Sequence, residues 1–277
     1  MSVEAAAPER SWTEPVAGTT SRLRHHFSRA RDIVLPIATA AAVLVLWEIV
    51  VRVGKVPVVI LPPPSDVVAL FARNYPLLLE HAVPTLSETV VGFVLAVVLG
   101  VGLAILITYS PNWRAALYPN LVLFQLIPKV ALAPLFIVWL GIGTQSRLAF
   151  ALFISFFPIV ISMATGLLEV DRDMLRLCRS LTATEWQIFT SVRFPAALPY
   201  LFSGMKIAMT MAMIGVIVGE FITAQAGLGY LIIFATSRAE TGVIMAAIGL
   251  LCVIGLGLYG LVLLGEAAMR RWYYGPS

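Results

Sequence analysis

Six long apolar runs constrain this chain more than any other feature. They cover approximately residues 33–53, 84–109, 117–142, 148–168, 199–222 and 242–269. A helix needs about 20 consecutive, predominantly apolar residues to cross the hydrocarbon core of a bilayer. The sequence therefore predicts an all-α membrane protein with six transmembrane helices.

The composition agrees with a lipid environment. Of the 277 residues, 60% are hydrophobic and only 12% are charged, and the mean hydropathy is +0.92. Water-soluble domains carry about 25% charged residues. The pI of about 9.3 is therefore attributed to membrane topology and not to nucleic-acid binding. Cys178 and Cys252 lack the spacing of metal ligands, and the sequence indicates no disulfide, metal or cofactor.

The basic residues predict the orientation of the chain. With six spans and the N-terminus inside, twelve arginines fall in inner segments and five basic residues in outer segments, while Lys129 and Lys206 fall within spans. Cytoplasmic loops are enriched in Lys and Arg, so both termini are expected in the cytoplasm. Residues 1–32 form a polar cytoplasmic tail in this interpretation, and residues 33–270 form the transmembrane domain. The tail carries glutamates, so the first run is interpreted as a retained helix and not a signal peptide.

The outer segment 54–83 contains a second, smaller signal. The run Pro62-Pro63-Pro64 precedes Ser65 and a short stretch from Asp66 to Arg73. Prolines followed by a serine N-cap predict a short interfacial helix here, with a plain connector as the alternative.

The segment 169–195 is the long polar interruption, and the charge count places it in the cytoplasm. Its apolar and arginine residues alternate as in short amphipathic helices. Asp173 is the candidate cap of a first helix. Thr182-Ala183-Thr184-Glu185 has the form of a capping box, so a second helix should extend to about residue 192, before Pro195 and Pro199 break it. Such an elbow suits a groove in another protein, but the composition alone equally allows it to lie on lipid headgroups.

The elbow also carries a sequence motif. Arg176-Leu177-Cys178-Arg179-Ser180-Leu181-Thr182 is followed, after nine residues, by Val192-Arg193-Phe194-Pro195. This resembles the cytoplasmic loop of ABC-importer permeases, with the pattern Glu-Ala-Ala-x3-Gly-x9-Ile-x-Leu-Pro. Arg176 replaces the glutamate, as is common in the nitrate, sulfonate and taurine branch, and Thr182 replaces the glycine. Because glycine permits a turn with positive φ, we expect Thr182 to turn the chain differently, as an N-cap with β-region backbone.

Further matches to that branch follow in order: Leu61 to Ser65, Pro84-Thr85-Leu86, Pro128 to Leu135, Pro195 to Ala208, Gly219-Glu220-Phe221 and Gly227-Leu228-Gly229-Tyr230. The resemblance implies a type I, MetI-like permease in the bacterial inner membrane, forming a homodimer with two ABC ATPase subunits and served by an extracytoplasmic solute-binding protein. It also implies alternating-access import of a small polar organic solute or anion, such as a sulfonate, taurine, nitrate or a pyrimidine precursor. The implied ATPase-coupling residues are Arg176, Arg179, Leu181, Thr182, Glu185, Trp186, Phe189 and Pro195.

The sequence contains no Walker A motif, so this chain is not expected to be an enzyme, and ATP hydrolysis would require a separate subunit. The alternative function is an ion-coupled secondary transporter working alone. Such folds tend to have paired halves with broken helices and midplane charges. The sequence shows neither a second elbow nor a midplane acidic pair.

Three charged residues within the spans are candidates for the translocation path: Lys129, Lys206 and Glu220. Charges inside a membrane usually face protein or a watery path. Lys206 and Glu220 are fourteen residues apart on one helix, too far to pair, and each has a structural alternative near a membrane surface. A stripe of small residues in the same run, including Gly204, Gly215 and Gly219, favours close contact with neighbouring spans over a pore-facing stripe.

Overall fold

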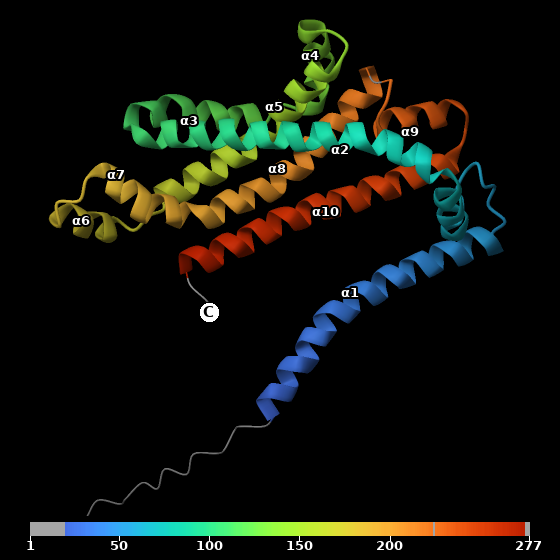
Figure 1. Ribbon diagram of the computed structural model, residues 1–277, viewed down its shortest axis with the longest axis horizontal. Coiled ribbons are helices and arrows are strands. Elements are labelled where there is room, and N and C mark those ends of the chain that lie inside the picture. The colour runs from blue at the N-terminus through green and yellow to red at the C-terminus, as the bar shows by residue number, and fades with distance from the viewer. Residues whose placement is uncertain (1–19, 224, 275–277) are drawn as a thin grey trace, which may run out of the picture. The chain divides into compact units, whose positions relative to one another are not determined.

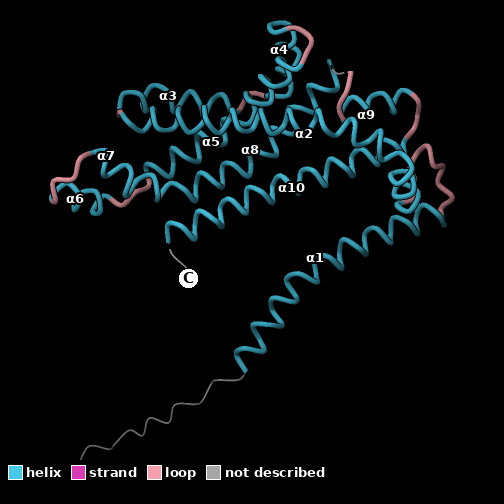
Figure 2. Tube along the Cα trace, viewed as in Figure 1, coloured by secondary structure: helices cyan, strands magenta, loops and turns pink. Residues whose placement is uncertain are grey.

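The computed structural model describes residues 20–223 and 225–274, and the regular elements within these ranges are helices (Figure 2). The chain divides into two units, Met1–Val56 and Pro57–Ser277. In the first unit, helix α1 spans Thr20–Val53 and contains a candidate membrane span, Val34–Val53. The helix thus begins before the predicted span. Residues 1–19 of the predicted tail lie outside the described residues.

Helix α2 opens the second unit and spans Pro64–Tyr109. Asn74 has a non-helical backbone (φ −111°, ψ 19°), so the predicted short helix is the first part of α2, before this kink. The prediction of Ser65 as its N-cap is wrong. Pro63 is the N-cap and Pro64 the first helical residue, which suits proline because its fixed φ matches a helix and no N–H is required there.

Helices α5 (Thr144–Leu168), α8 (Phe194–Thr223) and α10 (Thr241–Tyr274) form a bundle with α2 (Figure 1). The glycines of α8 allow close packing on α5. A Cβ atom built on Gly215 would lie 2.7 Å from the Cα of Ala151, and one on Gly204 would lie 2.9 Å from the carbonyl oxygen of Pro158. The structure therefore confirms that this part of the small-residue stripe makes a helix contact.

The third apolar run is not one straight helix. Helix α3 spans Pro111–Gln125, and after a break the chain continues as the 3₁₀ turn η1 (Lys129–Leu132) and helix α4 (Ala133–Leu140). The two parts are bent by 93°. Pro128 lacks a backbone N–H and disfavours helical geometry in the residue before it, which explains the break. Counting the bent pair as one span, the described residues contain up to six candidate spans, as predicted.

The elbow lies at one end of the bundle (Figure 1). It consists of α6 (Arg172–Ser180) and α7 (Glu185–Ile188), which continues through a π-helical segment, η2 (Phe189–Arg193), into α8. At the other end, α9 (Leu228–Ser237) connects α8 to α10. This short apolar helix was not predicted. Leu228 and Leu231 of α9 are buried in a cluster with Leu78 of α2 and residues of α10.

Candidate functional site

The first elbow helix begins two residues earlier than its predicted cap indicates. Asp171, not Asp173, is the N-cap of α6, and its Oδ1 accepts a hydrogen bond from the backbone N–H of Asp173 at 2.9 Å. An N-cap must precede the helix with its carboxylate directed at the first free N–H groups. Asp173 is already within the first helical turn, where it pairs with Arg176 at 3.0 Å.

The turn between α6 and α7 depends on Thr182, but not as an N-cap. Its φ is +57°, in the left-handed region that glycine normally occupies. The N–H of Ala183 donates to the carbonyl of Cys178, and that of Thr182 donates to the carbonyl of Arg179. These two bonds define a Schellman motif with Thr182 at the C′ position. The prediction of a β-region cap at Thr182 is therefore wrong: the threonine adopts the backbone geometry of the glycine in the family pattern.

The second elbow helix uses a capping box two residues further along. Thr184 is its N-cap and Gln187 reaches back to the backbone N–H of Thr184 at 2.8 Å, so the predicted pairing of Thr182 with Glu185 is wrong. Pro195 and Pro199 do not separate this helix from the fifth span. Helical backbone continues from residue 185 to 223, because Pro195 lies at the start of α8, directly after the π-helical segment.

The elbow exposes several apolar side chains. Trp186 is 72% exposed. The other exposed apolar residues of the elbow are Met174, Leu177 and Leu181. Phe189 is different: it stacks on Trp186, with ring centroids 5.9 Å apart, but also packs against the bundle core beside Phe194. We call Met174, Leu177, Leu181 and Trp186 the elbow surface. Exposed apolar groups of this kind mark interaction sites.

The predicted charged residues of the elbow form ion pairs within it. Arg179 contacts Glu185 at 3.2 Å, linking α6 to α7. Beside the elbow, a cavity of about 440 Å³ lies between the end of α5 and the start of α8. Pro195 lines it, together with Glu169 and Tyr200, whose hydroxyl donates to that carboxylate.

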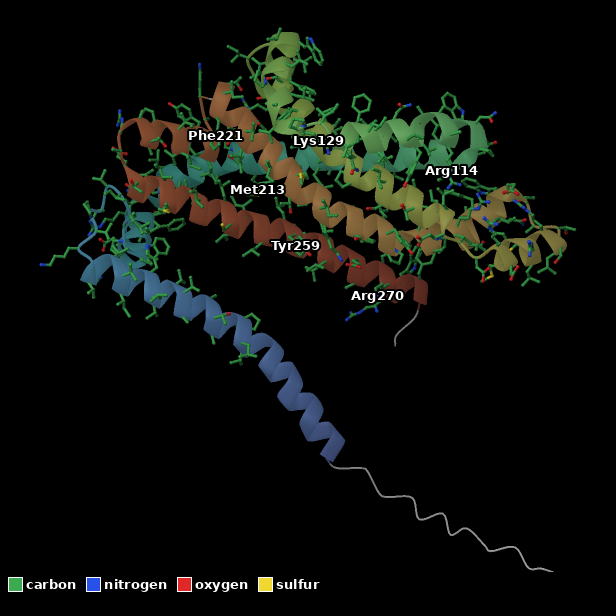
Figure 3. The ribbon with its side chains drawn as sticks, turned by 180° about the vertical axis from the view of Figure 1, so that it is seen from behind. Arg114, Lys129, Met213, Phe221, Tyr259 and Arg270 are labelled. Atoms are coloured by element: carbon green, nitrogen blue, oxygen red, sulfur yellow. The ribbon has the colours of Figure 1, made fainter. Side chains whose placement is uncertain are left out.

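Lys129 lies at the bend of the broken span (Figure 3). Its ammonium nitrogen is 4.8 Å from the ring centroid of Phe157 on α5, a cation–π contact. Within residues 34–273, no carboxylate forms an ion pair with it.

The other two path candidates lie elsewhere. Lys206 pairs with Glu266 of α10 at 2.6 Å, a partner that the sequence analysis did not identify. Glu220 is only 2% exposed and bonds to Thr85 and to the backbone of Gly229. The structure thus places the three candidates in three separate environments and does not bring them together.

A buried ion pair was also missed. Glu88 of α2 accepts two hydrogen bonds from Arg147 of α5, at 2.8 and 2.5 Å, and both side chains are largely buried. Arg147 was counted only as an outer topogenic charge. The only available signal was a glutamate within an apolar run, since its partner lies 59 residues away in the sequence.

Two labelled arginines of the second unit lie at the same end of the bundle (Figure 3). Arg114 and Arg270, both assigned to inner segments, lie toward the elbow end, while Phe221 lies toward the opposite end.

The chain matches the profile of the family described as "Binding-protein-dependent transport system inner membrane component" over residues 78–271. It belongs to this family. It is therefore a multi-pass inner membrane protein and a permease subunit of an ABC transporter, whose ATPase is a separate polypeptide.

Named relatives show similarity along most of the chain. The riboflavin transport system permease protein of Chloroflexus aurantiacus is 36% identical, covering 86% of this chain and 89% of the relative. The formylaminopyrimidine transport permease protein of Halalkalibacterium halodurans is 32% identical, covering 82% and 88%. The taurine transport system permease protein of Escherichia coli is 28% identical, covering 90% and 92%. This similarity supports the predicted branch of the family.

A solved structure supports the fold. The chain resembles one from "Inward facing conformations of the MetNI methionine ABC transporter", with a TM-score of 0.60 and 22% identity, over 72% of this chain and 99% of the other. The predicted MetI-like fold is confirmed.

Proposed function

We propose that the chain acts as a homodimer that binds two ATPase subunits through its elbows and imports a small polar organic solute by alternating access. The observation that carries this proposal is the elbow surface. Leu181 and Trp186 are 70% and 72% exposed at one end of the bundle, and a continuous helix from residue 185 connects Trp186 to the fifth span. Binding of this surface to an ATPase would transmit motion of the ATPase directly to α8.

We further propose that the elbow end, with both termini, faces the cytoplasm. The positive-inside count and the position of Arg114 and Arg270 toward the elbow (Figure 3) support this orientation. ATP is available on that side. A solute-binding protein would then approach the opposite end, where α9 lies.

The broken third span supports a translocation path at Lys129. Non-helical backbone at membrane depth is tolerated where it is buried in protein or lines a watery cavity. Lys129 directly follows the bend at residues 126–128. Its ammonium group lies over an aromatic ring, and no carboxylate among the described side chains forms an ion pair with it. An ammonium group in that place can donate hydrogen bonds to polar acceptor atoms of the solute.

The names of the relatives support a substrate class. Those at 36% and 32% identity are named for riboflavin and formylaminopyrimidine, and one at 28% for taurine. We therefore favour a nitrogen-containing heteroaromatic solute over a sulfonate. A thermal-shift screen of the chain's solute-binding protein against formylaminopyrimidine, riboflavin and taurine tests this: stabilisation by taurine alone would contradict it.

Reconstitution tests the proposed function as a whole. The chain would be purified with its ATPase, inserted into vesicles, and supplied with binding protein and labelled solute. We expect uptake that requires ATP. Uptake by this chain alone, driven by an ion gradient, would instead establish the secondary-transporter alternative.

A further inference from the structure

Three sequence motifs that are far apart in the chain meet at the end of the bundle opposite the elbow. Thr85 comes from α2, Glu220 from the last turn of α8, and the segment 227–229 forms the start of α9. Thr85 and Glu220 are 0% and 2% exposed. The coupling function assigned to the elbow does not account for any of them.

The contacts among them form one hydrogen-bond network. The hydroxyl of Thr85 donates to Glu220 Oε1 at 2.7 Å and accepts from the N–H of Leu228 at 2.8 Å. Glu220 Oε2 accepts from the N–H of Gly229 at 2.7 Å, and His81 Nδ1 accepts from the N–H of Gly227 at 3.2 Å. Side chains of α2 and α8 thus satisfy three consecutive backbone donors at the start of α9.

The two glycines allow this close approach. A Cβ atom on Gly227 would lie 2.2 Å from Glu220 Oε1, and one on Gly229 would lie 2.9 Å from Glu220 Oε2. Gly227 also has a φ of +116°, which disfavours any other residue. The spacing of Gly227-Leu228-Gly229 is therefore explained by the carboxylate that lies against it.

This arrangement does more than cap a helix. An N-cap residue within the loop would satisfy the free N–H groups but would leave α9 free to shift against its neighbours. Here the acceptors belong to two other helices, so satisfying the N–H groups also fixes α9 against α2 and α8. The buried cluster of Leu78, Leu228 and Leu231 packs the same three elements from the apolar side, with Ile217 of α8 at its edge.

We propose that Glu220 and Thr85 are positioning residues that fix α9 to α8, so that events at the extracytoplasmic end reach the ATPase through one helix. Helical backbone continues from residue 185 in the elbow to residue 223, beyond Glu220. Because the network joins α9 to the far end of this helix, displacement of α9 by the arriving binding protein would move the elbow. This inference depends on the proposed orientation and ATPase contact.

The experiment compares ATP hydrolysis by the reconstituted complex with and without solute-loaded binding protein. In Glu220→Ala and Thr85→Val we expect basal hydrolysis within about twofold of wild type, and stimulation by the binding protein reduced at least about fivefold, as expected for loss of a coupling interaction. Glu220→Gln should retain much of the stimulation, because its amide can accept from Gly229 and donate to the Thr85 hydroxyl, which can turn to the carbonyl of His81.

Thr89→Val provides the matched control. Thr89 is also fully buried on α2, but its hydroxyl bonds within that helix, to the carbonyl of Thr85. It should leave stimulation unchanged. Full stimulation in Thr85→Val, or an equal loss in Thr89→Val, would overturn the inference. A wild-type complex that hydrolyses no ATP would instead contradict the proposed function. If Glu220→Ala does not assemble, Thr85→Val still decides the question.

Discussion

Thr182 is a β-branched residue in a left-handed backbone conformation, with φ +57°. This conformation is costly for residues with a Cβ atom, whereas glycine adopts it readily but loses more chain entropy on folding. We predict that Thr182→Gly stabilises the elbow by about 0.5 to 1 kcal/mol. Hydrogen exchange of elbow peptides should slow in this variant and change little in Thr184→Gly, because glycine is a tolerated N-cap. Faster exchange in Thr182→Gly would show that the threonine side chain itself is needed.

The Glu88–Arg147 pair is a second feature at the scale of single residues. Removing one charge of a buried pair leaves the other uncompensated, at a cost of about 3 kcal/mol or more. We predict that Glu88→Gln lowers the thermal unfolding midpoint of the purified complex. Asp173→Asn makes the same acid-to-amide change in an exposed pair and should leave the midpoint unchanged. Equal midpoints for Glu88→Gln and wild type would show that the pair does not stabilise the fold.

At the scale of elements, the elbow surface is predicted to bind the ATPase. Interfaces concentrate binding energy in buried aromatic and aliphatic anchors, so Trp186→Ala should weaken assembly by about 2 kcal/mol or more. The measurement is co-purification of the ATPase at a series of protein concentrations. Trp272→Ala is the matched control, because Trp272 is a comparably exposed tryptophan, at 78%, outside the elbow. Undiminished recovery in a Leu181→Ala, Trp186→Ala double variant would reject this interface.

Two other elbow residues, Phe189 and Gln187, also contribute to the fold of the chain, so their variants would not test the ATPase contact alone. Phe189 is, like Trp186, one of the coupling residues that the resemblance implies, but it also packs on the bundle core. Phe189→Ala should therefore lower the stability of the chain as well as its assembly. Gln187 belongs to the capping box of α7, so Gln187→Ala is not a suitable control for Trp186→Ala.

The broken span gives a second prediction for an element. If the bend between α3 and η1 lines the translocation path, a cysteine in place of Lys129 should be accessible to water. In a background lacking Cys178 and Cys252, we expect Lys129→Cys to react with a small water-soluble thiol reagent. Complete protection with nucleotide absent, bound and hydrolysed would show that the bend is sealed within protein.

At the scale of the whole molecule, the proposed homodimer can be tested directly. Two differently tagged copies of this 30.0 kDa chain would be expressed together with the ATPase. We expect purification on one tag to recover the other, and the mass of the intact complex to include two permease chains. A complex with a single copy of this chain would contradict the homodimer.

The sequence alone determined the helical class, the six spans and the position of the elbow. Span length and amphipathic pattern are local properties, so the apolar runs predict them directly. The motifs around Thr182 and Pro195 were sufficient to indicate the family. The predicted N-caps of the two elbow helices differ from the observed ones by two residues. Asp171 and Asp173 carry the same side chain, as do Thr182 and Thr184, so the sequence does not distinguish between them. Only the backbone geometry distinguishes between them.

The tertiary structure decided which distant polar groups meet. Glu88 pairs with Arg147, which is 59 residues away in the sequence. Glu220 accepts a hydrogen bond from Thr85, which is 135 residues away. No local pattern encodes such pairs, because they depend on how the helices pack and rotate against each other. The tertiary structure also decided that α9 is fixed to α8, since the hydrogen bonds that hold it come from side chains of other helices. A buried carboxylate needs partners, but only packing determines which ones lie within bonding distance.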